Sequence, residues 1–378
     1  MARVQPPPGC PMHHNRMAAA AAGGGGGGDI QRCPMQAFSL GGASAAIKDT
    51  RSPNPSRSLL VVGNVFVGSA PSSPQRQQGT VTSSNGGGGG GGGALYSSVA
   101  AAHLGMKVEV LTKCRQEDVA TVAKLFDGAA VHVSYVTSSS ATTCVKMSNP
   151  SEQRKIQRLE SVAAPFTESE LQQHLSSTSS AEDLIIHIAP VCYGELPEHL
   201  IPLLRSKARY LVVDVTGFLL HHHKAEAERV ENSCLKDWVK KEEYLPMIDL
   251  LKVEGEEACR VLTGKKDLRE AVKILVERFG AKNVLATSKD AILLYDHDTK
   301  QFLESSLTLN HQQSSGEEAP ASMHEGSGDT ALAAFLAGGG ANATFSSWKR
   351  RVALEFAAKV TAVKLQYAGP YRRPSAAL

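Results

Sequence analysis

The segment HEGSGDTALAAFLAG, residues 324–338, sets two glycines and an aspartate directly before an alanine-rich run that is typical of a helix. Gly326 and Gly328 permit backbone conformations that are closed to other residues. At the start of a helix, the amides of Ser327, Gly328 and Asp329 would point outward without an intrahelical acceptor. Because the helix dipole also favours negative charge there, this turn could bind phosphate oxygens.

Asp329 is the first acidic residue of that helix, and two interpretations of it are open. A carboxylate beside a phosphate-binding turn can accept the proton of an attacking hydroxyl while the amides stabilise the transferred group. The same residue could instead be an N-cap or first-turn acid that only stabilises the helix. Taken alone, the segment favours the capping interpretation, so support for catalysis has to come from the rest of the chain.

The elements that would have to position this turn alternate between short apolar runs and amphipathic stretches. Residues 59–67 and 107–112 are typical of buried strands, and residues 94–105 between them are typical of a helix that ends at Gly105. The alternation predicts a mostly parallel sheet with helices on both faces and ligands at the carboxyl ends of its strands. Further predicted strands span residues 131–136, 143–147, 183–190, 210–215, 248–253 and 283–287, with a hairpin at 291–307, and further predicted helices span residues 117–126, 197–206, 234–243, 256–264, 268–279 and 348–367.

Composition favours a small-molecule partner. The chain has 378 residues, 42% of them hydrophobic, which can supply a sizeable core, and its formal charge of +3 forms no dense basic stripe that would bind nucleic acid. The seven cysteines are scattered without a CxxC pair, as expected for reduced thiols rather than disulfides or a zinc site. No apolar run reaches the roughly 20 residues of a membrane span, so we expect neither a membrane protein nor a secreted one.

Low-complexity composition sets the domain boundaries that we predict. Residues 1–57 combine poly-Pro, poly-Ala and poly-Gly tracts and form a predicted disordered extension, with an organelle transit peptide left open by its few acidic residues and its arginines. Residues 58–370 form the predicted folded domain, with a low-complexity loop at 69–93, and residues 371–378 a tail. Unless residues 1–57 target the protein to an organelle, we expect it in the cytoplasm.

Three motifs occur in an order that adds weight to the catalytic interpretation of Asp329. GGGALYSSVAAAHLG (residues 91–105), KVEGEEACRVLTG (residues 252–264) and GSGDT (residues 326–330) are similar to the Gly-Gly, Asn-x-x-Glu and Gly-Ala-Gly-Asp motifs of the ribokinase-like (PfkB) carbohydrate kinase family. Their co-linearity is stronger evidence than any single motif. Weaker agreements lie between them at residues 141–147, 189–195 and 212–218.

The resemblance implies a fold and an activity. The fold would be a three-layer α/β ribokinase-like domain with a mostly parallel central sheet, helices on both faces and a small, degenerate β lid. The activity would be ATP-dependent phosphorylation of a hydroxyl, with Mg²⁺ as the metal cofactor and a sugar or inositol-like polyol as the acceptor. A homodimer is left open, because many relatives dimerise through their lids.

The resemblance also implies roles for individual residues. Asp329 would be the general base, and Gly326, Ser327 and Gly328 would form the anion hole. The remaining implied roles are nucleotide binding at Thr287, acceptor binding at Gly91, Gly92 and Asn64, and metal binding at Glu257.

Several positions depart from the family pattern. Gly68 stands where an aspartate usually grips the acceptor, and residues 287–291, TSKDA, keep the threonine of the nucleotide loop but neither of its glycines. Glu254 replaces the asparagine of Asn-x-x-Glu. Glu325 adds a negative charge beside the anion hole, which could weaken phosphate binding or help to hold a metal.

These departures keep other functions open. The alternatives are a nucleoside kinase of the same fold and a catalytically impaired pseudokinase that binds a ligand or a protein partner. A dinucleotide-binding oxidoreductase is disfavoured, because no GxGxxG follows the first predicted strand.

Overall fold

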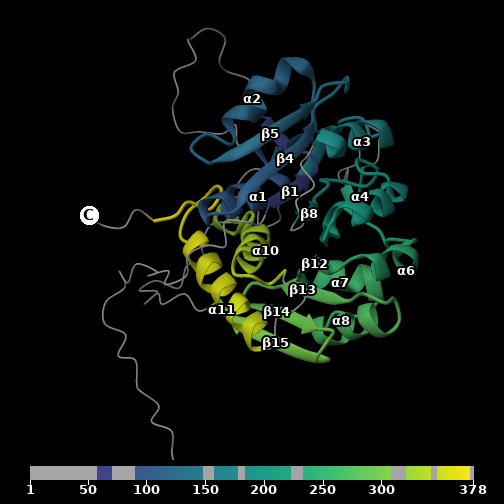
Figure 1. The fold of residues 1–378 in the computed structure, drawn as a ribbon, viewed down its shortest axis with the longest axis vertical. Helices are drawn as coiled ribbons and strands as arrows, with labels where there is room; N and C mark the ends of the chain where they lie inside the picture. Colours follow the sequence, from purple (N-terminus) through teal and green to yellow (C-terminus); the bar gives the residue numbers. More distant parts are fainter. Residues whose placement is uncertain are drawn as a thin grey trace, which may run out of the picture. The chain divides into compact units, whose positions relative to one another are not determined.

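Within the part of the chain that the structure describes, nine strands form one mixed sheet in the order β15-β14-β13-β12-β9-β8-β1-β4-β5 (Figure 1). The seven strands from β13 to β5 in this order run parallel, while β14 and β15 pair antiparallel at one edge. The strands are β1 (Ser58–Val62), β4 (Lys107–Lys113), β5 (Val131–Val136), β8 (Leu184–Ile188), β9 (Tyr210–Asp214), β12 (Leu250–Glu254), β13 (Asn283–Thr287), β14 (Ala291–Asp296) and β15 (Gln301–Ser306).

The structure is a computed structural model, and it describes residues 58–69, 90–147, 157–177, 184–222, 233–307, 321–341 and 347–374. The predicted extension at 1–57, most of the predicted loop at 69–93 and residues 375–378 of the predicted tail lie outside the described residues. In the part described, no helix is both long and apolar enough to cross a bilayer.

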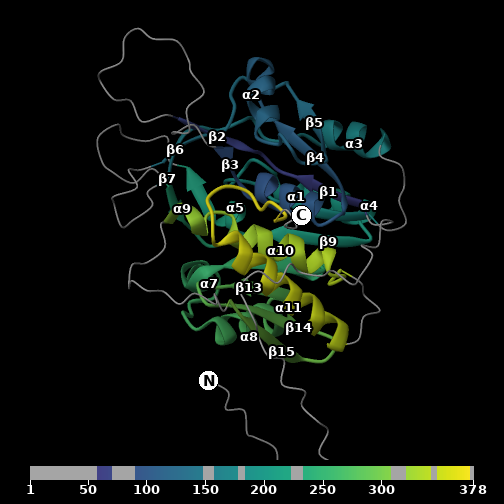
Figure 2. The ribbon, with the colours of Figure 1, turned by 90° about the vertical axis from the view of Figure 1, so that its left-hand side faces the viewer.

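Helices cover both faces of the sheet, as predicted. Alternate residues of β1 point to opposite faces: Leu59 and Val61 belong to one core cluster, and Leu60 and Val62 to the other. Figure 2 shows the first face, covered by α1 (Gly93–His103), α10 (Ser327–Ala337) and α11 (Ser347–Lys364). The opposite face carries α3 (Glu168–Ser177), α4 (Ile201–Lys207), α7 (Gly255–Thr263) and α8 (Leu268–Glu277), with the short helices α5 (Thr216–Leu219) and α6 (Lys241–Tyr244).

The strand predicted over residues 59–67 is in fact two strands in different sheets. It ends at Val62 and resumes as β2 (Phe66–Ser69), which pairs with β3 (Gly90–Gly91) and β6 (Cys144–Met147). Gly63 lies so close to the main chain of Ala189 that a Cβ would collide with its carbonyl oxygen. The Asn64 side chain then accepts a hydrogen bond from the Lys113 amide, so the backbone leaves the large sheet at this turn.

The small sheet built on β2 is the lid expected from the resemblance. Its order is β3-β2-β6-β7, with β7 spanning Gln157–Ser161. Two glycines of the low-complexity run, Gly90 and Gly91, form β3 opposite Val67 and Phe66. The Phe66 ring fills the place where Gly91 would carry a Cβ, so only glycine fits there.

The helix predicted over residues 234–243 is wrong. The segment begins as β11 (Ser233–Leu235), which pairs with β10 (Leu220–His222), and only α6 near its end is helical. Trp238 is fully buried between Phe218 and Tyr244 and donates its Nε1 hydrogen to Glu198 at 2.7 Å. This packing outweighs the helical pattern of the segment.

The other predicted elements match the observed ones with ends that differ by three residues or fewer. The helix predicted at 117–126 starts with a 3-10 turn, Gln116–Asp118, and continues as α2 (Val119–Lys124). The helix predicted at 197–206 likewise begins with the 3-10 turn Glu198–Leu200 before α4.

Candidate active site

Polar side chains gather where the parallel strands end. Asn64 follows β1, Lys113 ends β4, Asp214 ends β9, Glu254 ends β12 and Thr287 ends β13. These carboxyl ends meet at one edge of a parallel sheet, where α/β proteins bind their ligands. The glycine turn before α10 comes to the same edge, since Gly328 lies against both Thr287 and Glu254.

The start of α10 has the geometry of an anion-binding turn. Gly326 is the N-cap residue in the left-handed region, with φ of +71°, and no side chain caps the helix. The first turn closes with the Thr330 amide on the Gly326 carbonyl at 2.9 Å. The amides of Ser327, Gly328 and Asp329 precede that bond and have no acceptor within the helix. The Tyr96 ring of α1 fills the space of a Cβ on Gly326, which holds the turn in place.

Asp329 does not cap α10. One of its oxygens, Oδ1, accepts a hydrogen bond from the Lys252 ammonium at 2.5 Å, and the same ammonium donates to Asp214 Oδ2 at 2.7 Å and to Glu254 Oε2 at 3.3 Å. Lys252 and Asp214 are buried, and the Asp329 side chain keeps 10% of its surface exposed. Three carboxylates therefore surround one ammonium directly behind the anion-binding turn.

The charges of this cluster shift the titration of its members. Burial is the largest cause that raises the pKa of Asp329, and with Asp214 and Glu254 nearby the pKa reaches about 6 despite the opposite effect of Lys252. Burial also opposes ionisation of Asp214, yet the charge and hydrogen bond of Lys252 lower its pKa below the usual range. Burial disfavours the charged form of Lys252, but the three carboxylates raise its pKa well above the usual value. The cluster carries an excess of negative charge when its acids are ionised.

Thr287 and Gly328 form a cradle beside these charges. A Cβ on Gly328 would lie 3.1 Å from Thr287 Oγ1 and 3.0 Å from Glu254 Oε2. Thr287 Oγ1 is buried and has no hydrogen-bond partner among the described residues. A buried hydroxyl without a partner is costly in a folded protein, and a phosphate oxygen in the cradle would satisfy it.

The glycines predicted to bind the acceptor directly precede α1. Gly91 belongs to the small sheet, and Gly92 has φ of +103° and caps α1 without a side chain. The next residue, Gly93, is close to both carboxylates, because its Cβ would stand 3.3 Å from Asp329 Oδ1 and 3.5 Å from Asp214 Oδ2. The N-terminus of α1 thus faces the same carboxylates as the N-terminus of α10.

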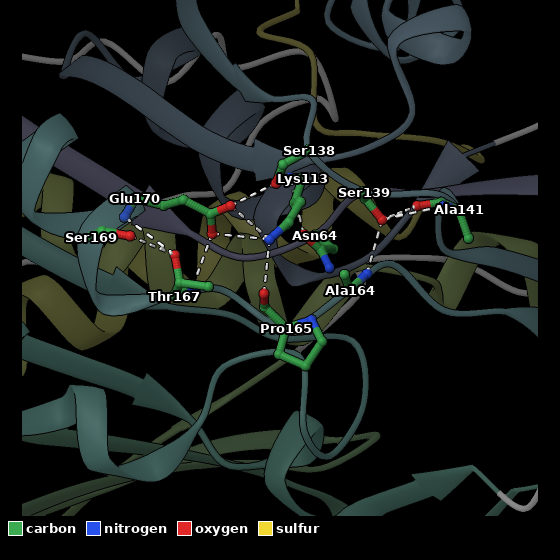
Figure 3. Close-up of polar contacts among 10 residues, drawn as sticks. All are labelled: Asn64, Lys113, Ser138, Ser139, Ala141, Ala164, Pro165, Thr167, Ser169 and Glu170. Carbon is green, nitrogen blue, oxygen red and sulfur yellow. Dashed lines mark hydrogen bonds and ion pairs between the residues drawn. The ribbon is translucent and has the colours of Figure 1, made fainter.

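Asn64 is fully buried, and its side chain links the turn after β1 to the end of β4 (Figure 3). Its Oδ1 accepts from the Lys113 amide at 3.0 Å. The Lys113 ammonium donates to both oxygens of Glu170 at 2.9 Å and to the Pro165 carbonyl at 2.8 Å (Figure 3). Asn64 therefore helps to hold the turn that directs the chain into the lid, and its role in acceptor binding stays a prediction.

The Lys113–Glu170 pair should make stability depend on acidity. Burial opposes ionisation of Glu170, but hydrogen bonds from Ser138, Lys113 and the Thr167 amide lower its pKa from 4.5 to about 2. A lowered folded pKa stabilises the protein above pH 4.5, and this contribution is lost as pH falls toward 2. For Glu170→Gln we expect a loss of unfolding free energy on the order of 1 kcal/mol at pH 7.

Urea unfolding at pH 7 and pH 3 measures this effect, and the difference between Glu170→Gln and the unmodified protein should shrink at the lower pH. Glu168→Gln is the matched control, because Glu168 is an exposed residue of the same helix whose carboxylate accepts from Gln172. An equal loss in both variants at both pH values would contradict the assignment.

The described residues do not build a metal centre. No group of three or more His, Cys, Asp or Glu side chains among them is arranged to hold a metal ion. Asp214, Glu254 and Asp329 converge on the Lys252 ammonium instead. Glu257, the predicted metal residue, lies in the first turn of α7 with 71% of its side chain exposed and pairs with Arg260 at 3.8 Å. Its metal role stays a prediction.

Sequence reasoning missed Lys252 and Asp214. The signal was available: each is a charged residue at a buried position near the end of a mostly apolar strand, in YLVVD and LLKVE. It also missed His187, fully buried in β8, whose Nδ1 lies 3.2 Å from Ser97 Oγ and whose Nε2 has no hydrogen-bond partner among the described residues. Burial lowers the pKa of His187 to about 4, so it is neutral at physiological pH.

Comparisons with known proteins give the relatives of this chain. No protein-family model and no curated protein sequence matches it. A solved pyrophosphate-dependent kinase in the ribokinase family, complexed with a pyrophosphate analog and myo-inositol, is 33% identical with a TM-score of 0.65. That match covers 83% of this chain and 98% of the other.

Ribokinase structures share the fold at lower identity. Arabidopsis thaliana ribokinase, complexed with ribose and ATP, is 16% identical with a TM-score of 0.55, over 85% of this chain and 97% of that one. Ribokinase from Cryptococcus neoformans var. grubii, in complex with ADP, is 15% identical with a TM-score of 0.54, over 83% and 96%.

The fold and site place this chain in the class of ribokinase-like kinases. The features that define the class are a mostly parallel sheet with helices on both faces, a small β lid and an uncapped glycine turn at the carboxyl edge of the sheet. The chain belongs to the ribokinase-like (PfkB) carbohydrate kinase family. The predicted fold class and the resemblance are both confirmed.

Proposed function

We propose that the chain transfers a phosphoryl group to a hydroxyl of a sugar or inositol-like polyol. The observation that carries this proposal is the pairing of a buried carboxylate, Asp329, with the uncapped amides of the same helix turn. The 33% identical structure with bound myo-inositol supports a polyol as the acceptor. A nucleoside acceptor remains the alternative within the same fold.

The mechanism uses the chain's own groups in three ways. Asp329 accepts the proton of the acceptor hydroxyl through its oxygen Oδ2, since Oδ1 is held by Lys252. Gly326, Ser327 and Gly328 form the anion hole: the left-handed Gly326 starts the turn, and the uncapped amides of Ser327, Gly328 and Asp329 stabilise the negative charge on the phosphoryl group during transfer. Thr287 Oγ1, which lies against Gly328, donates to a phosphate oxygen of the donor.

The donor contains a phosphoanhydride, and two donors fit that description. ATP is the one implied by the resemblance, and the second candidate is pyrophosphate, which the 33% identical kinase uses. The turn after Thr287 lacks the glycines of the family's nucleotide loop, which weakens the case for ATP without deciding between the two donors. The Ser288 amide bonds to the Ala291 carbonyl at 2.9 Å in a tight hairpin, and Lys289 and Asp290 occupy its tip instead of glycines. Side chains there hinder the close approach of the backbone to a phosphate, which glycines would allow.

The proposal includes Mg²⁺, which would bind together with the phosphoryl donor. Because Asp214, Glu254 and Asp329 surround Lys252, the part of the chain that the structure describes provides no preformed cage for the ion. Mg²⁺ commonly binds through substrate phosphates with few protein ligands.

The test is a donor and acceptor panel with the full chain. MgATP and magnesium pyrophosphate are each combined with myo-inositol, ribose, adenosine or no acceptor, and phosphorylated products are identified by ³¹P NMR and mass spectrometry. Phosphorylated myo-inositol or ribose supports the proposal, and the productive donor settles the choice between the two. Product from adenosine alone would favour the nucleoside kinase. Calorimetric ligand binding without any product would favour the impaired pseudokinase.

The boundaries and assembly of the domain are also proposals. We place the catalytic domain at residues 58–370, between the extension at 1–57 and the tail at 371–378, although the first tail residue, Tyr371, is buried in the core of the domain. Limited proteolysis with mass spectrometry would map these boundaries, and analytical ultracentrifugation would test the homodimer. Fluorescent fusions with and without residues 1–57 would distinguish a cytoplasmic protein from one that is targeted to an organelle.

A further inference from the structure

Lys252 is a fully buried lysine to which the proposed mechanism assigns no step of its own. It lies in β12, whose neighbouring positions Leu250, Leu251 and Val253 are buried core residues. Its ammonium has three hydrogens, and each has a carboxylate acceptor: Asp214, Glu254 and Asp329. Burying an ammonium costs several kcal/mol of desolvation, and well-packed apolar residues often stabilise a core better. Stability alone therefore does not account for a lysine here.

The Lys252 ammonium lies at unequal distances from its three carboxylates, and Asp329 is the nearest. The shortest contact, 2.5 Å, joins its ammonium to Asp329 Oδ1, and the contact with Glu254 is longer at 3.3 Å. Glu254 is also the most exposed of the three acids, with 47% of its side chain accessible against 10% for Asp329. The ammonium is thus tied most closely to the two buried acids, Asp214 and Asp329. Among the described residues, Asp329 Oδ2 accepts no hydrogen bond, so one oxygen of the carboxylate stays available.

We propose that Lys252 is a positioning residue that holds Asp329 ionised and turned so that Oδ2 faces the acceptor hydroxyl. This inference rests on the proposed function of Asp329 as the general base. Lys252 does not touch the substrate in this arrangement, because its three hydrogens are already engaged by carboxylates. It acts through Asp329 alone.

The charged and titratable groups around Asp329 show why a fixed cation is needed. Those that face it or its immediate partners are Lys252 and Glu254 from β12, Asp214 from β9, Tyr96 from α1, His187 from β8, and Glu325, which lies beside Tyr96. Lys252 is the only one among these that carries positive charge at neutral pH, since His187 is neutral. Without Lys252, Asp329 would face two other carboxylates inside a buried site, and like charges at short range favour its protonated form.

The experiment compares the pH dependence of kcat in the unmodified chain, Lys252→Met and Lys252→Arg. The general base must be ionised to accept a proton, so kcat should rise with pH through the pKa of Asp329. In Lys252→Met we expect the midpoint of this rise to move upward by about two pH units, with kcat at pH 7 lowered roughly tenfold because only about a tenth of Asp329 would then be ionised. Lys252→Arg keeps the charge and should return the midpoint toward that of the unmodified chain.

A second readout does not depend on turnover. The carboxyl carbons of ¹³C-labelled aspartates are titrated by NMR in the free protein, and the signal of Asp329 is assigned with Asp329→Asn. The same upward shift is expected in Lys252→Met. If no kinase activity is found with any donor or acceptor, the proposed function fails, while this titration still decides whether Lys252 keeps Asp329 ionised.

Lys113→Met is the matched control, because Lys113 is also a buried lysine at the end of a strand, paired to Glu170 instead of the Asp329 cluster. It should lower stability without moving the midpoint. If circular dichroism shows that Lys252→Met is unfolded, Lys252→Gln replaces it with the same expected direction. A folded neutral variant with an unchanged midpoint, or with faster turnover at pH 7, overturns the inference.

Discussion

An Asp329→Asn variant should turn over about 10²- to 10⁴-fold more slowly than the unmodified chain, the range expected when a general base is removed. The amide keeps the size of the side chain and still offers an oxygen to Lys252, so the fold should persist. The KM values for donor and acceptor should change much less than kcat, because the lost interaction acts in the transition state. Steady-state kinetics with the best donor and acceptor pair measure both parameters.

In the unmodified protein, the role of Asp329 as the general base should be visible in the pH dependence of kcat. Burial and the neighbouring acids raise the pKa of Asp329 to about 6, so kcat should rise from pH 5 to pH 7 and then level off. Asp127→Asn is the control, because Asp127 is an exposed aspartate just after α2. Turnover that is equal in Asp329→Asn and Asp127→Asn would remove Asp329 from the mechanism.

A Gly328→Ala variant should lose donor binding and turnover together. The added methyl would stand 3.0 Å from Glu254 Oε2 and 3.1 Å from Thr287 Oγ1, in the place proposed for a donor phosphate. Displacing a phosphoryl group from anion-hole donors costs about 10²- to 10³-fold in rate, so we expect kcat to fall by that factor and the donor KM to rise. The acceptor KM should change less, since the predicted acceptor residues Gly91 and Gly92 belong to β3 and the start of α1, whereas Gly328 belongs to α10.

Gly338→Ala is the control for crowding. Gly338 is at the opposite end of α10, and its Cβ would meet Ala334, Ala353 and Phe356 at 3.2 Å, which is similar crowding without a phosphate site. It should lower the melting temperature while leaving the donor KM unchanged. If both glycine variants changed the donor KM equally, Gly328 would have no special part in donor binding.

Local sequence determined most of the secondary structure and the position of the glycine turn. Strands such as 283–287 and helices such as 268–279 were predictable, because their apolar periodicity also decides which face they bury. Two errors had tertiary causes. The run at 59–67 divides between two sheets because Gly63 packs on Ala189, and the helix predicted at 234–243 yields to the packing of Trp238.

The sequence by itself determined that Asp329 follows a Gly-Ser-Gly turn, because four consecutive residues carry that information. Only the tertiary structure decided what surrounds it. Lys252 is 77 residues from Asp329 and 38 from Asp214 along the chain, and it reaches both because β9 and β12 are adjacent parallel strands whose carboxyl ends meet the start of α10. The spacing of these residues along the sequence does not predict that their side chains come into contact. The order of strands in the sheet decides it, and that order follows from how the whole core packs.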